Sequence, residues 1–170
     1  MERHFTVSGF VSQRGETALH WHRLGMWLPP GGHIEPDEDP IEAVRREVLE
    51  ETGLAVEVVP TAPAYGDWAY PPQLPAPVTM GVYDIEAGGP HQRASHQHID
   101  LVYFTRPTPG QPLLLPDNDE EGWLWVSAET LQAGEVLRSP HGGEAAIAED
   151  VRRLGIDAIE AVRALETGAA

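Results

Sequence analysis

Residues 32–54, GHIEPDEDPIEAVRREVLEETGL, carry three glutamates at spacings that place them on one face of a helix. Glu47 lies three residues before Glu50 and four before Glu51, and residues at these separations are neighbours on a helix surface. Like charges at this spacing repel one another by roughly a few tenths of a kcal/mol per close pair. A hard divalent cation such as Mg²⁺ or Mn²⁺ would reverse the sign of this interaction, because both ions prefer oxygen ligands. The stretch therefore predicts a helix that holds a metal ion.

The same stretch contains signals for both ends of that helix. Asp39 can cap its N-terminus, Pro40 suits the first helical position, and Glu42 can complete a capping box with Asp39. Gly53 favours the C-terminal end, because glycine readily adopts the left-handed conformation with which many helices end. The apolar stripe that borders the acidic face consists of Ile41, Val44 and Val48. This pattern predicts a helix that packs by one side and presents its carboxylates along the adjacent side.

These residues resemble the signature of the Nudix hydrolase family, Gly-x5-Glu-x7-Arg-Glu-U-x-Glu-Glu-x-Gly-U, in which U is a bulky aliphatic residue. Every fixed position is matched, by Gly32, Glu38, Arg46, Glu47, Val48, Glu50, Glu51, Gly53 and Leu54. The resemblance implies an α/β/α sandwich with a central mixed sheet, formed as a single domain over residues 1–170. It also implies metal-dependent hydrolysis of a diphosphate (P–O–P) bond in a nucleoside di- or triphosphate, or in another nucleoside diphosphate linked to a group X.

The resemblance assigns roles to particular residues. The expected metal ligands for Mg²⁺ or Mn²⁺ are Glu47, Glu50, Glu51 and a backbone carbonyl at Gly32, with Gly31 as the alternative. Glu47 is also a candidate general base, and Glu120, in the acidic loop before a tryptophan-containing strand, is a second. Arg46 is expected to orient a glutamate rather than to contact the substrate.

Substrate choice is expected to depend on the loops outside the signature. Residues 61–77 contain five prolines together with Trp68 and Tyr70, flat faces on which a base could stack. A tyrosine near this position resembles the dinucleoside-polyphosphate subgroup, whereas the proline typical of ADP-ribose enzymes is displaced to Pro71. Arg93 is one of the few cations available to a substrate phosphate. Packing of these aromatics over the core is the alternative.

Composition narrows the range of functions. The chain of 170 residues has 27 acidic and 11 basic residues, a formal net charge of −16, and no cysteine. All of its basic residues are arginine, which excludes a phosphate-binding Walker lysine and Schiff-base catalysis. The negative charge disfavours stable duplex nucleic-acid binding. The sequence shows neither a long apolar run nor a signal-peptide pattern, so a cytoplasmic protein without a membrane span is expected.

Hydrophobic patterning predicts a largely β chain around the signature helix. The predicted strands are residues 4–12, 17–23, 55–60, 78–86, 98–106 and 123–126, followed by a short helix capped by Ser127. Residues 98–106 are apolar on both faces and are expected to be central. The tail from Glu144 is predicted to be helical, and could pack on the sheet or pair with a second copy to form a homodimer. Trp27 is expected in the core.

Two other functions compete with the hydrolase, and a second kind of metal site is also considered. A non-catalytic nucleotide-binding module could keep the fold, although it need not retain all three acids. An isomerase of the isopentenyl-diphosphate type resembles this fold but normally uses a cysteine, which is absent here. A zinc site at His91, His96 and His98 is disfavoured, because their spacing matches no usual zinc framework.

Overall fold

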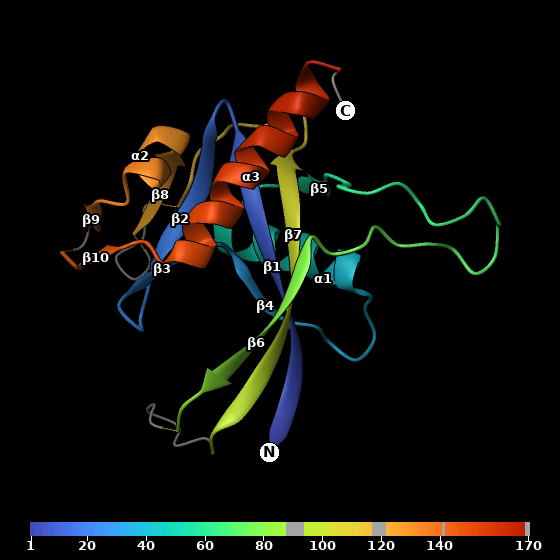
Figure 1. Ribbon diagram of the computed structural model, residues 1–170, viewed down its shortest axis with the longest axis horizontal. Coiled ribbons are helices and arrows are strands. Elements are labelled where there is room, and N and C mark those ends of the chain that lie inside the picture. Colours follow the sequence, from blue (N-terminus) through green and yellow to red (C-terminus); the bar gives the residue numbers. More distant parts are fainter. Residues whose placement is uncertain (88–93, 117–121, 141, 169–170) are drawn as a thin grey trace.

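Two long strands form the centre of the molecule. In a computed structural model, which describes residues 1–87, 94–116, 122–140 and 142–168, β1 (Glu2–Gln13) and β7 (His96–Pro107) run parallel along nearly their whole length. Figure 1 shows them side by side through the middle of the sheet. β7 also pairs with two further strands, which confirms that residues 98–106 are central.

The remaining strands extend this pair into a mixed sheet. They are β2 (Glu16–His22), β3 (Met26–Leu28), β4 (Gly31–His33), β5 (Val56–Val58), β6 (Thr79–Ile85) and β8 (Trp123–Ser127). The main path runs β3-β2-β1-β7-β5, with β4 on β1, β6 on β7 and β8 on β2. Every one of these pairings except β1–β7 is antiparallel.

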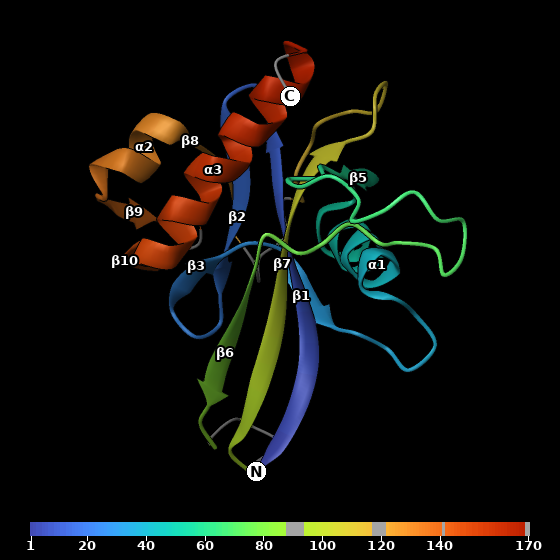
Figure 2. The same cartoon turned by 45° about the vertical axis from the view of Figure 1, so that its right-hand side comes forward.

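Helices cover the two faces of this sheet. Helix α1 (Pro40–Thr52) packs on one face, and α3 (Glu149–Glu166) packs on the other with the short α2 (Ala128–Ala133) beside it, as Figure 2 shows. The α1 side of the core includes Val7, Val11, Val44, Val48 and Tyr103. The α3 side includes Phe10, Val102, Phe104, Ile159 and Val162. The predicted α/β/α sandwich with a central mixed sheet is confirmed.

The prediction for the tail is wrong at its start. Residues Glu144–Ala146 form strand β10, which pairs with β9 (Val136–Arg138), and the helix begins only at Glu149. Pairing with the strand just before it in the chain overrides the local helical pattern there. The rest of the tail, helix α3, packs on the sheet. This was one of the two arrangements expected for it, the other being pairing with a second copy. Within the described ranges, no helix combines the length and the apolar character needed to cross a bilayer.

The ends of α1 match the sequence prediction. The Asp39 side chain accepts hydrogen bonds from the backbone N–H groups of Ile41 and Glu42, and the Glu42 carboxylate accepts one from Asp39 N–H at 2.9 Å. The helix ends at Gly53, whose φ is 73°. Gly9 lets α1 approach β1 closely, because a Cβ there would lie 2.8 Å from a methyl group of Val44. Local capping and this close contact together position the acidic face of α1.

His20 on β2 is buried and stacks on Trp123, with the ring centroids 4.6 Å apart. Its Nδ1 atom is buried and has no hydrogen-bond partner among the described residues. Burial, helped by the nearby His22, lowers the pKa of His20 from 6.5 to about 4. The folded protein therefore keeps His20 neutral at pH values where the unfolded chain protonates it.

This difference predicts acid sensitivity. The stabilising contribution is complete above pH 6.5 and is lost as the pH falls toward 4, because the unfolded state then binds a proton that the folded state does not. We expect His20→Phe, which keeps the ring stacking, to remove about 3 kcal/mol of the pH dependence of the unfolding free energy across this window. Urea unfolding at a series of pH values measures it, and His22→Gln, which removes only the smaller cause of the shift, should reduce the pH dependence slightly. Parallel pH profiles for wild type and His20→Phe would contradict the assignment.

Candidate active site

Arg46 on α1 connects the acidic side chains of the signature. Its Nε and one terminal nitrogen donate to the two oxygens of Glu38, at 3.0 and 2.5 Å. The other terminal nitrogen donates to Glu47 at 2.8 Å and to Glu50 at 3.2 Å. A further bond of 2.9 Å runs from Arg46 to the backbone carbonyl of His33 at the end of β4. One guanidinium thus ties the helix to the loop between β4 and α1.

This network favours the charged form of Glu38. The hydrogen bond that Arg46 donates to Glu38 lowers the pKa of Glu38 and raises the pKa of Arg46, and the bond from Arg46 to Glu47 adds to the effect on Arg46. The side chains of Glu38 and Glu47 are only 12% and 14% exposed, whereas that of Glu50 is 60% exposed. Arg46 therefore holds the two sheltered carboxylates in place and leaves Glu50 open to solvent. The expected role of Arg46 in orienting a glutamate for catalysis stays a prediction.

The backbone of β4 presses against the same acids. A Cβ at Gly32 would lie 2.4 Å from Oε1 of Glu47, so only glycine leaves room for that carboxylate. Gly31 N–H donates to Oε2 of Glu51 at 3.0 Å. Arg46 and β4 thus gather Glu47, Glu50 and Glu51 around one short piece of backbone.

The ladder between β1 and β4 distinguishes the two glycines. The paired residues are Thr6–His33, Val7–Gly32 and Ser8–Gly31, and Gly9 N–H donates to the carbonyl of Pro30 at 2.9 Å. In an antiparallel ladder, alternate residues direct their backbone groups toward the partner strand. Gly32 accordingly directs its N–H and C=O toward β1, and Gly31 directs its own away from β1, toward Glu51.

The oxygen-rich character of this cluster fits a hard divalent cation. The side chains that surround β4 offer carboxylate oxygens, and the backbone there offers carbonyl oxygens, which are ligands that suit Mg²⁺ and Mn²⁺. The glycine at position 32 leaves the space in which Glu47 sits. The residues therefore fit the metal that the sequence implies.

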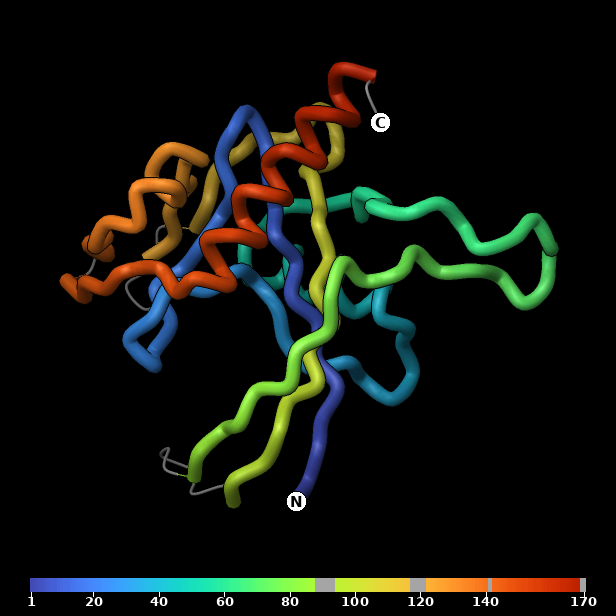
Figure 3. The backbone as a smooth tube through the Cα atoms, in the orientation of Figure 1, coloured from blue at the N-terminus to red at the C-terminus, as the bar shows by residue number. Residues whose placement is uncertain are grey.

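The predicted substrate residues are less closely tied to this cluster. Trp68 and Tyr70 lie on the loop of residues 61–77, which projects far from the body of the molecule in Figure 3. They are 45% and 86% exposed, and Trp68 contacts Tyr65 rather than the core. Arg93 and Glu120 lie outside the described residues. Trp27, by contrast, is fully buried, which confirms its place in the core.

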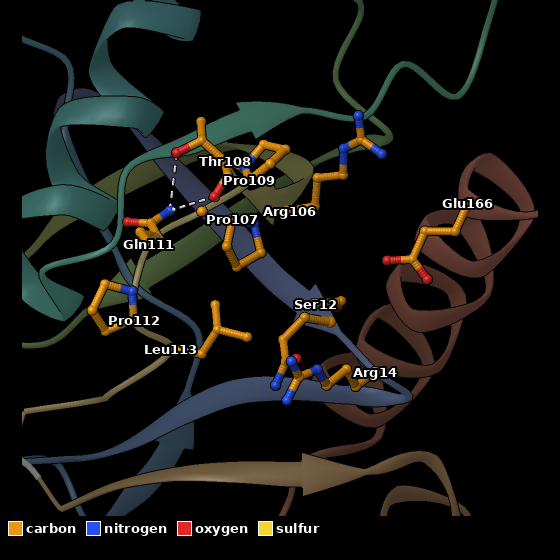
Figure 4. Close-up of a pocket in the computed structure, with 12 residues that line it drawn as sticks. Ser12, Arg14, Arg106, Pro107, Thr108, Pro109, Gln111, Pro112, Leu113 and Glu166 are labelled. Carbon is orange, nitrogen blue, oxygen red and sulfur yellow. Dashed lines mark hydrogen bonds between the residues drawn. The ribbon is translucent and has the colours of Figure 1, made fainter.

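A separate pocket of about 620 Å³ lies away from these acids. Figure 4 shows it between the β1–β2 turn, the segment after β7 and the end of α3. Arg14, Arg106 and Glu166 are among its lining residues, and Arg106 is paired with Glu57 at 2.6 Å. No residue of the Arg46 network lines it.

Comparison with known proteins agrees with this geometry. The family model described as the NUDIX domain matches residues 2–144. The chain belongs to the Nudix family. A solved Nudix structure, a hydrolase from Clostridium perfringens, is 28% identical and covers 95% of this chain and 99% of its own, with a TM-score of 0.67.

Relatives of known name within the Nudix family differ in activity. Phosphatase NudJ of Escherichia coli strain K12 is 27% identical over 152 residues, which is 88% of this chain and 81% of NudJ. The m7GpppN-mRNA hydrolase NUDT17 of Danio rerio is 30% identical over 115 residues, or 64% of this chain. The matched part is 34% of that protein, so the chain spans about a third of the length of this relative.

Sequence reasoning missed two features of the Nudix site. Glu38 was recognised only as a signature position, although the structure makes it the bidentate partner of Arg46. Glu38 precedes the helix, which begins at Pro40, and lies eight residues from Arg46. The spacing of residues on a helix therefore could not indicate this contact. The second feature is a group of histidines beside His33, drawn from strands far apart in sequence.

Proposed function

We propose that this Nudix protein hydrolyses a diphosphate bond in a nucleoside di- or triphosphate or a related nucleoside diphosphate linked to a group X. The observation that carries the proposal is the Arg46 network, which arranges the signature carboxylates around the backbone of β4. A binding module would not need this arrangement of paired charges. Family membership and relatives named as hydrolases or a phosphatase support it.

The metal ligands in this proposal are Glu47, Glu50 and Glu51, with Mg²⁺ or Mn²⁺ as the ion. A backbone carbonyl completes the set of ligands. The pairing of β1 with β4 favours the carbonyl of Gly31, because the backbone N–H and C=O of Gly32 point to β1. When bound, the ion neutralises the diphosphate and lowers the pKa of water, which makes hydroxide available near neutral pH.

The protein residues then have separate tasks. Arg46 holds Oε1 of Glu47, which leaves the second oxygen of that carboxylate to bind the ion or to accept the proton of the attacking water. The water oxygen forms a bond to phosphorus, and the bridging P–O bond breaks with its electrons remaining on the leaving phosphate. Glu120 is the second candidate for the base. Serine and cysteine nucleophiles are not required.

The substrate is proposed to be held by residues outside the signature. Trp68 and Tyr70 would stack a base, because their projecting loop leaves both rings accessible. Arg93 would contact a phosphate. NUDT17 is named for a capped mRNA, in which a triphosphate bridges two nucleosides, so dinucleoside polyphosphates rank beside ADP-ribose as alternatives to simple nucleotides. The cytoplasmic location and the homodimer stay predictions.

A hydrolysis screen tests the function. Wild-type protein with Mg²⁺ is assayed on nucleoside triphosphates, ADP-ribose and dinucleoside polyphosphates, with release of phosphate or of a nucleoside monophosphate as the signal. We expect turnover of at least one compound, its loss on chelation, and a fall of about 10- to 100-fold in Glu50→Gln. Equal turnover in wild type and Glu50→Gln would refute the metal-site assignment. A folded protein that is silent on the whole panel would favour a binding module.

A further inference from the structure

Four histidines gather on one face of the sheet, on the side opposite α1. His4 on β1 is paired in register with His98 on β7, and Thr6, two residues later on β1, is paired with His33 on β4. Paired residues in a sheet point to the same face, and residues two apart on a strand do so as well. His96 therefore shares this face with the other three. Val7 and Gly32 point to the opposite face, toward α1.

The ring nitrogens of these histidines are close enough to share an ion. One nitrogen from each of His4, His33 and His98 lies within 4.8 Å of the others. His4 Nδ1 is 3.2 Å from His33 Nε2, and His96 Nε2 is 3.2 Å from His98 Nε2. In a tetrahedral site with metal–nitrogen bonds of about 2.0–2.1 Å, neighbouring ligand nitrogens lie roughly 3.3 Å apart. The His4–His33 and His96–His98 separations have this size. The His98 nitrogen lies no more than 4.8 Å from those of His4 and His33.

Neighbouring groups orient two of the rings. Nε2 of His4 lies 3.1 Å from the carboxylate of Glu2, so that nitrogen can carry the proton and leave Nδ1 facing His33. His96 Nδ1 lies 3.1 Å from the carbonyl of Ala94, which leaves its Nε2 facing His98. A carboxylate or carbonyl behind a histidine is the usual support of a metal-binding imidazole.

We propose that His4, His33 and His98, with His96 beside them, bind a transition-metal ion of the zinc class at a site distinct from the carboxylate cluster. Imidazole nitrogens suit Zn²⁺, Co²⁺, Ni²⁺ and Cu²⁺, whereas Mg²⁺ prefers oxygen. The chain would thus hold two sites that differ in chemistry as well as position. They are linked through β4, since Gly31 contacts Glu51 and the carbonyl of His33 accepts from Arg46.

The cluster lies toward the starts of β1 and β7, on the face that these two strands share with His33 of β4. Figures 1 and 2 show that this end of β1 and β7 extends beyond both α1 and α3. A bound ion would join β1, β4 and β7 where neither helix covers the strands.

Metal titration of the intact protein tests this site. Co²⁺ is added to metal-free protein, and visible absorption typical of a tetrahedral nitrogen-bound ion is expected to saturate at one equivalent. Calorimetric titration with Zn²⁺ then gives the affinity. We expect the double variant His4→Ala/His98→Ala to bind Zn²⁺ at least ~100-fold more weakly, and Glu2→Gln, which removes a supporting carboxylate, about 10-fold more weakly.

Matched variants separate this site from other binding. His22→Ala, on β2, removes a histidine outside the cluster, and Glu50→Gln alters only the carboxylate site; both are expected to keep the Co²⁺ spectrum. Circular dichroism checks that each variant is folded, and His33→Gln replaces the double variant if that one unfolds. An unchanged Co²⁺ spectrum in folded His4→Ala/His98→Ala or His33→Gln would overturn the proposal. So would absence of saturable Co²⁺ binding, or its loss in Glu50→Gln. None of these results depends on hydrolysis.

Discussion

Replacing Arg46 with lysine is expected to lower kcat/KM by about 100- to 1,000-fold. The guanidinium makes five hydrogen bonds, to both oxygens of Glu38, to Glu47, to Glu50 and to the carbonyl of His33. Lysine carries its donors on a single nitrogen and cannot reproduce this planar fork. Glu47 would lose its fixed orientation, so the effect is on catalysis by a carboxylate that remains present. Steady-state kinetics on the substrate found in the screen measure it.

The neighbouring arginine supplies the control for this prediction. Arg45 lies on the same helix and donates from Nε to the carbonyl of Val56 at 3.2 Å, away from the carboxylates. Arg45→Lys is expected to change kcat/KM by less than about threefold, since it alters no group near the reacting atoms. Unfolding of Arg46→Lys should cost about 1–3 kcal/mol less than that of wild type, because Glu38 loses its partner. Similar kinetics in both variants would show that Arg46 has no positioning role.

Glu47→Gln is expected to lower kcat by about 1,000-fold, because it removes the carboxylate that the site uses as metal ligand and candidate base. Glutamine has the same shape and can still accept the hydrogen bond from Arg46, so the melting temperature should change little. Measuring kcat against Mg²⁺ concentration separates the two roles. A weakened ligand is partly rescued at high Mg²⁺, whereas a lost base is not.

Glu42→Gln is the matched control for this variant. Glu42 lies on the same helix but caps its N-terminus, and glutamine also serves at that position of a capping box. Its kcat should therefore equal that of wild type. A comparable loss in Glu42→Gln would mean that the activity responds to helix stability rather than to Glu47. Unchanged activity in Glu47→Gln would exclude it from the mechanism.

The signature helix could be predicted almost completely from the sequence. Its start at Asp39 and Pro40, the capping box with Glu42 and the end at Gly53 all depend on residues within a few positions of one another. The positions of β1, β2, β5, β6, β7 and β8 followed from alternation and apolar content, and the central place of β7 from its two apolar faces. The short strands β3, β4 and β9 were not predicted. The beginning of the tail was mistaken, because β10 exists only by pairing with β9.

Part of the candidate site could likewise be predicted from the sequence, and part required the folded structure. The spacing of Glu47, Glu50 and Glu51 predicted a shared helical face, and the absence of lysine and cysteine excluded several chemistries. The contact of Arg46 with Glu38, and the approach of β4 to the acids, required the folded loop. These contacts come from chain segments that local periodicity does not relate.

The sequence by itself determined the helix, its acidic face and the family to which the chain belongs. The helix and its acidic face depend on interactions between residues one to four apart, which repeat with the helix period, and the family is read from the signature within residues 32–54. The tertiary structure alone decided which glycine turns its backbone to the acids, and it alone brought His4, His33 and His98 together. Both depend on strand register, in which a shift of one residue moves every side chain to the other face. Register is set by long-range pairing, and no local pattern in the sequence specifies it.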